Sequence, residues 1–192
     1  MTHLAIFASG TGSNAHRIIE HFRDHPTVRV ALVVSNRKAA GVLPMAERYG
    51  VPTAYVPKAD WQDSARVLGL LDAFEVDFIA LAGFLLLVPA YLVDAFPQRI
   101  VNIHPALLPK FGGKGMYGAY VHRAVRAAGE TESGITIHYV NAQYDDGDVI
   151  FQAKTPLGAE DSPEEIGRRV LVLEHRYYPE VLEQLLSSPG AD

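Results

Sequence analysis

The sequence predicts an α/β fold, an open and mostly parallel Rossmann-like sheet with helices on both faces and an appended antiparallel hairpin. Apolar runs of strand length alternate with longer helical patterns up to residue 104, and a glycine-rich turn joins the first run to the first helix. Two strand-like runs then follow one another near residues 134–154. Continuous apolar strands separated by helices are typical of a parallel sheet covered on both faces. A ligand is then expected beyond the carboxyl ends of the strands.

The first half of the chain supplies five expected strands and the helices between them. The strands are expected at 3–8, 28–35, 53–56, 77–83 and 99–104. The helical patterns between them cover about 13–24, 41–49, 61–74 and 90–96. Each strand is a nearly unbroken apolar run, which is the pattern of a strand buried on both faces.

The pattern changes after residue 104. Residues 105–118 are expected to form a loop and 119–128 a helix, and GITIHYVN (134–141) and DVIFQAK (148–154) are expected to pair across AQYDDG. The last helix has a clear start, because Ser162 is an expected N-cap with Pro163 and Glu165 at the first and third helical positions. Pro179 is expected to end or kink this helix.

Length and composition are those of a globular protein. The 192 residues are expected to form one domain over 1–186 with a frayed tail at 187–192. The net charge of −5 argues against a nucleic-acid-binding surface. No cysteine is present, which excludes disulfides and cysteine-ligated metals and is compatible with the cytoplasm. The most apolar window, 79–93, is too short for a membrane span, so no membrane partner is expected.

The turn ASGTGSNA (8–15) follows the first strand and opens the first helix. Backbone N–H groups of Gly12, Ser13 and Asn14 at the helix N-terminus suit a single phosphate. The pattern Gly10, Gly12 and Ala15 also fits a dinucleotide-binding turn, although the second strand ends in SNRK without the expected acidic residue. Arg37 would meet an adenosine 2′-phosphate there, which keeps an NADP-binding oxidoreductase or a non-catalytic nucleotide-binding module open. The simplest alternative is a tight turn without a ligand.

The stretch VNIHPALLPKFGG (101–113) ends the fifth strand with two polar side chains. Strand alternation directs Asn102 and His104 to one face, at the carboxyl end of the strand. A carboxylate from YDDGDVI, such as Asp145, would raise the pKa of His104 and fix its tautomer if it lay nearby. Asn102 would then offer an amide donor to an oxyanion. The alternative is that Asn102 and His104 only anchor the following loop and that Asp145 is only a turn residue.

The chain offers no serine or cysteine arranged as a nucleophile, because it has no cysteine and no G-x-S-x-G motif. Acyl transfer directly from donor to acceptor is therefore more natural than an acyl-enzyme. The eight histidines include no H-E-x-x-H motif, and His104, His122 and His138 fall in different elements, so no metal is expected.

Five segments together resemble the folate-dependent formyltransferase family, specifically its phosphoribosylglycinamide formyltransferases. They are SGTGSN, LAGFLLLV, NIHPALLPKF, YDDGDVIFQ and LEHRYYP, which follow the family order over nearly the whole chain. The resemblance implies the formyltransferase fold. It also implies transfer of the formyl group of 10-formyltetrahydrofolate, the cosubstrate, to the amino group of glycinamide ribonucleotide in de novo purine biosynthesis.

The resemblance also implies roles for particular residues. His104 corresponds to the general acid, Asn102 to the oxyanion partner and Asp145 to the group that raises the pKa of His104. Gly12, Ser13 and Asn14 correspond to the phosphate turn and Glu174 to the residue that holds the glycinamide amino group. Leu85, Leu86, Leu87 and Val88, with Asn102, correspond to the folate-binding segment. The expected partners are these two small molecules, and the chain is expected to be a monomer or a homodimer.

Two features depart from common family members. The segment Leu85-Leu86-Leu87 lacks their arginine, and the loop FGGKGMYGAY is longer and richer in glycine than theirs. Other enzymes that use formyltetrahydrofolate remain alternatives. The one that acts on methionyl-tRNA usually carries an extra C-terminal domain, and the formyltetrahydrofolate hydrolase an extra N-terminal one. We expect neither domain here.

Overall fold

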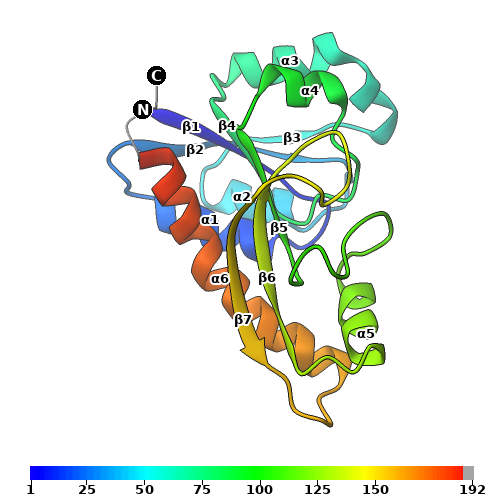
Figure 1. Ribbon diagram of the computed structural model, residues 1–192. Coiled ribbons are helices and arrows are strands. Elements are labelled where there is room, and N and C mark those ends of the chain that lie inside the picture. Colours follow the sequence, from blue (N-terminus) through cyan, green and yellow to red (C-terminus); the bar gives the residue numbers. More distant parts are fainter. Residues whose placement is uncertain (188–192) are drawn as a thin grey trace.

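The computed structural model describes residues 1–187, and the remainder of the expected frayed tail, 188–192, lies outside the described residues. A seven-stranded sheet in the order β3-β2-β1-β4-β5-β6-β7 organises the chain (Figure 1). The first five strands of that order are parallel, while β6 pairs antiparallel with both β5 and β7. The strands are β1 (Thr2–Phe7), β2 (Val28–Ser35), β3 (Thr53–Tyr55), β4 (Phe78–Leu81), β5 (Ile100–His104), β6 (Glu132–Tyr139) and β7 (Val149–Pro156). The predicted fold class is confirmed.

Helices cover both faces of the sheet. They are α1 (Ser13–Phe22), α2 (Val42–Arg48), α3 (Ser64–Ala73), α4 (Ala90–Ala95), α5 (Ala119–Ala127) and α6 (Pro163–Ser187), with a short 3₁₀ helix η1 (Lys58–Gln62). One core contains side chains of α1, α2, α5 and α6, and the other contains side chains of η1, α3 and α4. Figure 1 shows α3 and α4 on the opposite side of the sheet from α1, α2 and α6.

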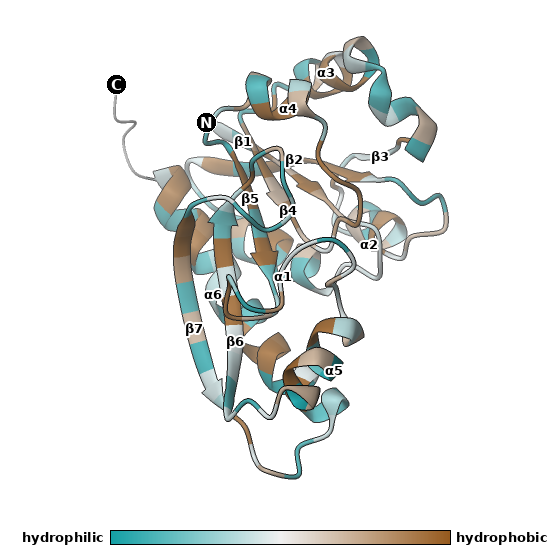
Figure 2. Cartoon of the chain, turned by 45° about the vertical axis from the view of Figure 1, so that its right-hand side comes forward, coloured by the Kyte–Doolittle hydropathy of each residue, from teal (hydrophilic) through white to brown (hydrophobic). Residues whose placement is uncertain are grey.

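Strand alternation explains the continuous apolar runs. In β1, Leu4 and Ile6 belong to one core while Ala5 and Phe7 belong to the other, and all four are fully buried. A strand covered on both faces needs apolar side chains at every position. Figure 2 shows hydrophobic colouring along β1 and β4, whereas β7 alternates between hydrophobic and hydrophilic residues. The difference follows because β7 is an edge strand with more exposed side chains.

Two helices differ from the expectation. The helix expected at about 61–74 is divided into η1 and α3, because Asp63 is the N-cap of α3 and accepts a hydrogen bond from the Arg66 amide. Pro179 does not end α6, which continues to Ser187. Proline inside a helix costs about 3 kcal/mol. Burial of neighbouring side chains in the core, Tyr178, Val181 and Leu182 among them, offsets that cost.

Tyr178 connects α6 to the strands β4 and β5. Its ring is fully buried, and its hydroxyl donates to the carbonyl oxygens of Leu81 (2.9 Å) and Val101 (3.3 Å), which lie in β4 and β5. Glu174 lies four residues earlier on the same helix, so it shares a face with Tyr178. These two hydrogen bonds therefore help to place Glu174 beside the ends of the strands.

No helix within residues 1–187 has both the length and the apolar character needed to cross a membrane.

Candidate active site

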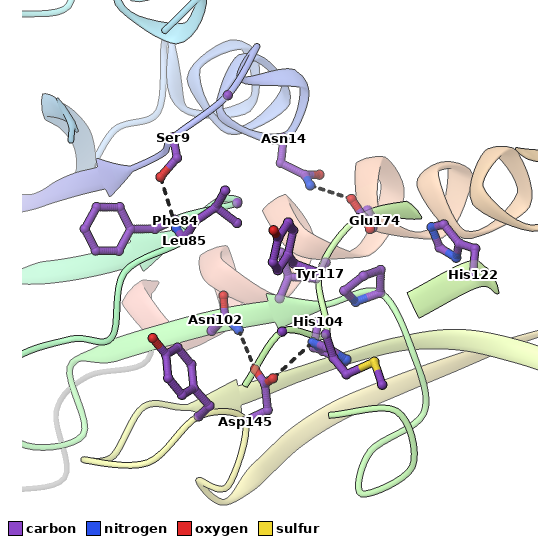
Figure 3. Close-up of a pocket in the computed structure, with 18 of the residues that line it drawn as sticks. Ser9, Asn14, Phe84, Leu85, Asn102, His104, Tyr117, His122, Asp145 and Glu174 are labelled. Carbon is purple, nitrogen blue, oxygen red and sulfur yellow. Dashed lines mark hydrogen bonds and ion pairs between the residues drawn. The ribbon is translucent and has the colours of Figure 1, made fainter. Parts of the chain in front are cut away.

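A cavity of about 480 Å³ opens at the carboxyl ends of β1, β4 and β5. Its wall combines the turn after β1, the segment after β4, the end of β5, the loop that precedes α5, the loop between β6 and β7, and one face of α6 (Figure 3). The expected site residues Asn14, Leu85, Asn102, His104, Asp145 and Glu174 all line it. A cleft at this end of the sheet is where an open α/β fold places a ligand.

Asn102, His104 and Asp145 meet at the centre of this wall. His104 Nδ1 lies 3.5 Å from Asp145 Oδ2, and Asn102 Nδ2 donates to Asp145 Oδ1 at 3.4 Å. Asp145 adopts φ 53°, a left-handed conformation that aspartate tolerates better than most residues. The Gly113 amide donates to Asp145 Oδ2 at 3.0 Å. Asp145 is therefore both a turn residue and a member of the cluster.

His138 is a fourth member of the cluster, a residue that the sequence left either lining the cleft or packed within the sheet. Antiparallel pairing of β5 with β6 sets Asn102 opposite His138. His138 Nδ1 donates to the Tyr139 carbonyl at 2.8 Å, and its Nε2 lies 3.1 Å from Asn102 Nδ2 and 3.7 Å from Asp145 Oδ1. The Asn102 amide nitrogen thus faces both His138 and Asp145. His138 therefore joins the cluster through the register between β5 and β6, which the sequence alone does not give.

Both ring nitrogens of His104 face acceptors. Nε2 donates to the Phe111 carbonyl at 2.8 Å, while Nδ1 faces the Asp145 carboxylate. Burial lowers the pKa of His104, and this effect outweighs the opposing influence of Asp145 and the Phe111 carbonyl. The expectation that Asp145 raises the pKa of His104 thus describes one contribution correctly, but the net direction is downward. The reason is the burial of the side chain, which is only 4% exposed.

The pKa of Asp145 is lowered. Burial acts in the opposite direction, but interactions with His138, His104 and the Gly113 amide together outweigh it. Asp145 therefore stays a carboxylate over the physiological range, and its negative charge favours the protonated form of His104.

Glu174 and Asn14 form a second polar pair across the cavity. Asn14 Nδ2 donates to Glu174 Oε2 at 2.5 Å (Figure 3). Burial raises the pKa of Glu174, and the hydrogen bond from Asn14 only partly opposes that rise. Asn14 Oδ1 is buried without a hydrogen-bond partner among residues 1–187, which leaves it available to accept from a ligand.

Residues of the glycine turn line two different hollows. Asn14 lines the cavity, whereas Gly12 and Ser13 line a neighbouring hollow of about 580 Å³ that also contacts Arg23 and Arg48. Gly12 adopts φ 84°, and a Cβ there would lie 2.5 Å from Val42. The turn therefore requires glycine for steric reasons, whatever ligand it holds.

The expected folate-binding segment, residues 85–88, also lines two separate spaces. Leu85 lines the cavity, and its amide donates to Ser9 Oγ at 3.0 Å. Leu86, Leu87 and Val88 instead line a small adjoining pocket of about 60 Å³. Asn102 and Asp145 line both spaces, so the two are neighbours on either side of this pair.

The sequence did not predict several cavity residues from the later part of the chain, Tyr117 and His122 among them. Tyr117 lines the cavity from the glycine-rich loop, which supplies one of its walls. His122, on α5, is 9% exposed, and its Nδ1 has no hydrogen-bond partner among residues 1–187. The glycine-rich loop and an isolated histidine were the available signals, and neither indicates by itself which way a side chain points.

Within residues 1–187 there is no group of three or more histidine, aspartate or glutamate side chains that would hold a metal ion.

Comparison with known proteins identifies relatives over almost all of the chain. A family model described as "Formyl transferase" matches residues 2–182. The phosphoribosylglycinamide formyltransferase of Bacillus subtilis is 36% identical over 97% of this chain and 95% of its own length. The chloroplastic phosphoribosylglycinamide formyltransferase of Arabidopsis thaliana is 46% identical over 93% of this chain, which spans 63% of that relative. The chain likewise spans 60% of the relative from Vigna unguiculata.

Solved structures similar to this chain include enzymes of the same kind as these sequence relatives. A crystal structure of glycinamide ribonucleotide transformylase 1 from Geobacillus kaustophilus superposes with a TM-score of 0.88 at 37% identity, covering 97% of this chain and 99% of that one. The phosphoribosylglycinamide formyltransferase of Streptococcus pneumoniae gives a TM-score of 0.85 at 35% identity, covering 96% and 99% of the two chains.

Proposed function

The chain belongs to the formyl transferase family, with phosphoribosylglycinamide formyltransferases as relatives, and on this premise we propose that it formylates glycinamide ribonucleotide. The formyl donor is 10-formyltetrahydrofolate, and the reaction is a step of de novo purine biosynthesis. The observation that carries the proposal is one cavity that is lined by Asn102, His104 and Asp145 and also by Asn14 and Glu174. The first three suit carbonyl chemistry, and the other two suit recognition of a polar substrate.

The reaction is a direct transfer. The glycinamide amine attacks the formyl carbon, so a new C–N bond forms and a tetrahedral oxyanion develops. The bond from that carbon to N10 of the folate then breaks. The proton lost by the amine is transferred to N10, so the overall charge balances. Binding both substrates in one cavity supplies the proximity that such a transfer requires.

Asn102 and His104 act on the oxyanion. The bond from Asn102 Nδ2 to Asp145 is the longer of its two, 3.4 Å against 3.1 Å to His138, so an oxyanion competes for that hydrogen. Protonated His104 adds a charged donor, which is worth more than a neutral one in a site that excludes water. Its Nε2 proton is held by the Phe111 carbonyl, which a substrate acceptor has to displace.

Glu174 receives the substrate amine. A cationic amine lowers the pKa of the buried carboxyl toward its ordinary value, because an opposite charge favours the ionised form. Asn14 Oδ1 has no hydrogen-bond donor among residues 1–187 and accepts a second hydrogen bond from the substrate. The neutral amine needed for attack forms when its proton passes to Glu174 or to water.

The direct test is an assay with glycinamide ribonucleotide and 10-formyltetrahydrofolate that follows the release of tetrahydrofolate. His104→Ala should lower kcat by about 10²-fold or more, the usual effect of losing an acid or oxyanion donor. His21→Ala is the control, because His21 lies on α1 against Glu183, outside the cavity lining. No product from the wild-type enzyme at saturating substrates would overturn the proposal.

Substrate controls separate the alternatives. Formylmethionyl-tRNA synthesis and hydrolysis of 10-formyltetrahydrofolate without an acceptor should both stay at background. Thermal-shift titration should show stabilisation by glycinamide ribonucleotide and none by NADPH. Stabilisation by NADPH alone would favour a nicotinamide-binding protein instead.

A further inference from the structure

Arg37 lines the cavity, and the chemistry described above leaves it unused. Of the lysine and arginine side chains in the part of the chain that the structure describes, it is the one that lines this space, together with the carboxylates of Asp145 and Glu174. Arg37 is exposed. Its guanidinium forms no hydrogen bond or ion pair within residues 1–187, where its backbone amide donates to Ser35 Oγ. An unpaired cation at the wall of a ligand cavity is free to bind an anion.

The segment that carries Arg37 is tied to the glycine turn. Ser9 Oγ donates to Asn36 Oδ1 at 2.5 Å, and the amide of Val42 donates to the Gly10 carbonyl at 3.1 Å. These bonds hold the chain on both sides of Arg37 against the turn that follows β1. Arg37 therefore stands at the same end of the cavity as Gly10 and Asn14.

We propose that Arg37 binds the phosphate group of the ribonucleotide substrate. This inference rests on the proposed function. A phosphate monoester carries a charge of about −1.5 to −2 at neutral pH. A helix N-terminus offers only about half a positive charge, and Asp145 and Glu174 line the same cavity. Arg23 and Arg48 line the neighbouring hollow instead, so within the cavity most of the phosphate charge is uncompensated without Arg37. A guanidinium adds a full charge and pairs with phosphate through two parallel hydrogen bonds.

Substitution of Arg37 tests the proposal through the two Michaelis constants. Arg37→Ala should raise KM for glycinamide ribonucleotide about 10- to 100-fold, the range expected for a lost charged hydrogen bond. The KM for 10-formyltetrahydrofolate and kcat should stay within about twofold. Arg37→Lys should fall between the two, because lysine retains the charge but not the paired geometry. Lys38→Ala is the matched control, since Lys38 is the exposed neighbouring cation and does not line the cavity.

A substrate that lacks the phosphate gives the sharper test. Glycinamide riboside should be a poor substrate for the wild-type enzyme, and Arg37→Ala should not weaken it further, because two changes to one contact are not additive. A wild-type KM for glycinamide ribonucleotide in Arg37→Ala would overturn the assignment, and so would an equal loss with the riboside. A rise confined to the folate KM would instead assign Arg37 to the folate. If the wild-type enzyme formylates the ribonucleotide, the proposed function stands whatever Arg37 does.

Discussion

His104 Nδ1 lies 3.5 Å from Asp145 Oδ2, and the two residues come from the end of β5 and from the loop that joins β6 to β7. Both side chains are largely buried, with 4% of the His104 side chain and 11% of the Asp145 side chain exposed. Burial and the carboxylate therefore act on the imidazole in opposite directions. The balance between them sets the pH range in which His104 is able to donate a proton.

Asp145→Asn tests this balance. Removing the negative charge removes the influence that raises the pKa of His104, so that pKa should fall further below 6.5. A general acid works below its pKa, so the loss of kcat at rising pH should begin at lower pH in the variant. We also expect kcat at neutral pH to fall about 10²-fold. Asparagine suits the left-handed backbone at this position, which separates the charge effect from strain.

The control for this variant is Asp146→Asn. Asp146 is exposed and accepts a hydrogen bond from Asn141 Nδ2, away from the histidines. Its pH–rate profile should match that of the wild-type enzyme. An unshifted profile in Asp145→Asn as well would show that Asp145 acts only as a turn residue.

Glu174→Gln should lose activity and gain stability. Burial raises the pKa of Glu174 in the folded chain, so the folded state binds more protons than the unfolded state between the two pKa values, and stability falls as pH rises through that window. At neutral pH a neutral amide avoids this cost and still accepts from Asn14 Nδ2. We expect Tm at pH 7 to rise by about 2 °C, equivalent to roughly 0.5–1 kcal/mol.

The stability gain should disappear below the unfolded-state pKa, where the glutamate is protonated in both states. Activity should also fall in Glu174→Gln. We expect kcat/KM for glycinamide ribonucleotide to decrease about tenfold or more. Glu180→Gln, at an exposed position on the same helix, should change neither quantity. Full activity in Glu174→Gln would remove Glu174 from the substrate site.

Gly12→Ala should destabilise the protein. Alanine at φ 84° is strained, and its Cβ would lie 2.5 Å from Val42 Cγ2, so the start of α1 or of α2 has to shift. We expect a loss of about 1–3 kcal/mol in the free energy of unfolding, measured by urea titration. Gly50→Ala separates the two causes. Gly50 also has positive φ (71°), but a Cβ there would have no atom of the described residues 1–187 within 4 Å, so that variant should cost less. Equal losses would show that strain alone accounts for the effect.

Tyr178→Phe removes the hydroxyl that joins α6 to β4 and β5. Two buried carbonyl oxygens lose a donor, which should cost about 1–3 kcal/mol, or roughly 3–8 °C in Tm. Tyr177→Phe is the control, because Tyr177 is half-buried on the same helix and packs against Phe151. If Tyr178→Phe unfolds at the wild-type temperature, these hydrogen bonds do not hold the helix.

The sequence by itself determined the features that depend on local periodicity. Unbroken apolar runs separated by helical patterns predicted the parallel strands, and the turn AQYDDG predicted the hairpin. Period-two alternation also predicted that Asn102 and His104 share a face, which holds because side chains of a strand alternate regardless of what surrounds them.

Tertiary structure decided whatever depends on distant residues or on the depth of burial. Asn14 and Glu174 are 160 positions apart, and only the packing of α6 under the sheet brings them together. Pro179 remains inside α6 because burial of that helix face outweighs the tendency of proline to end a helix. His138 joins Asn102, His104 and Asp145 through the register between β5 and β6. The pKa of His104 falls because desolvation outweighs a nearby carboxylate. The physical reason is common to all four: each is a balance between a local tendency and surroundings that exist only once the chain has folded.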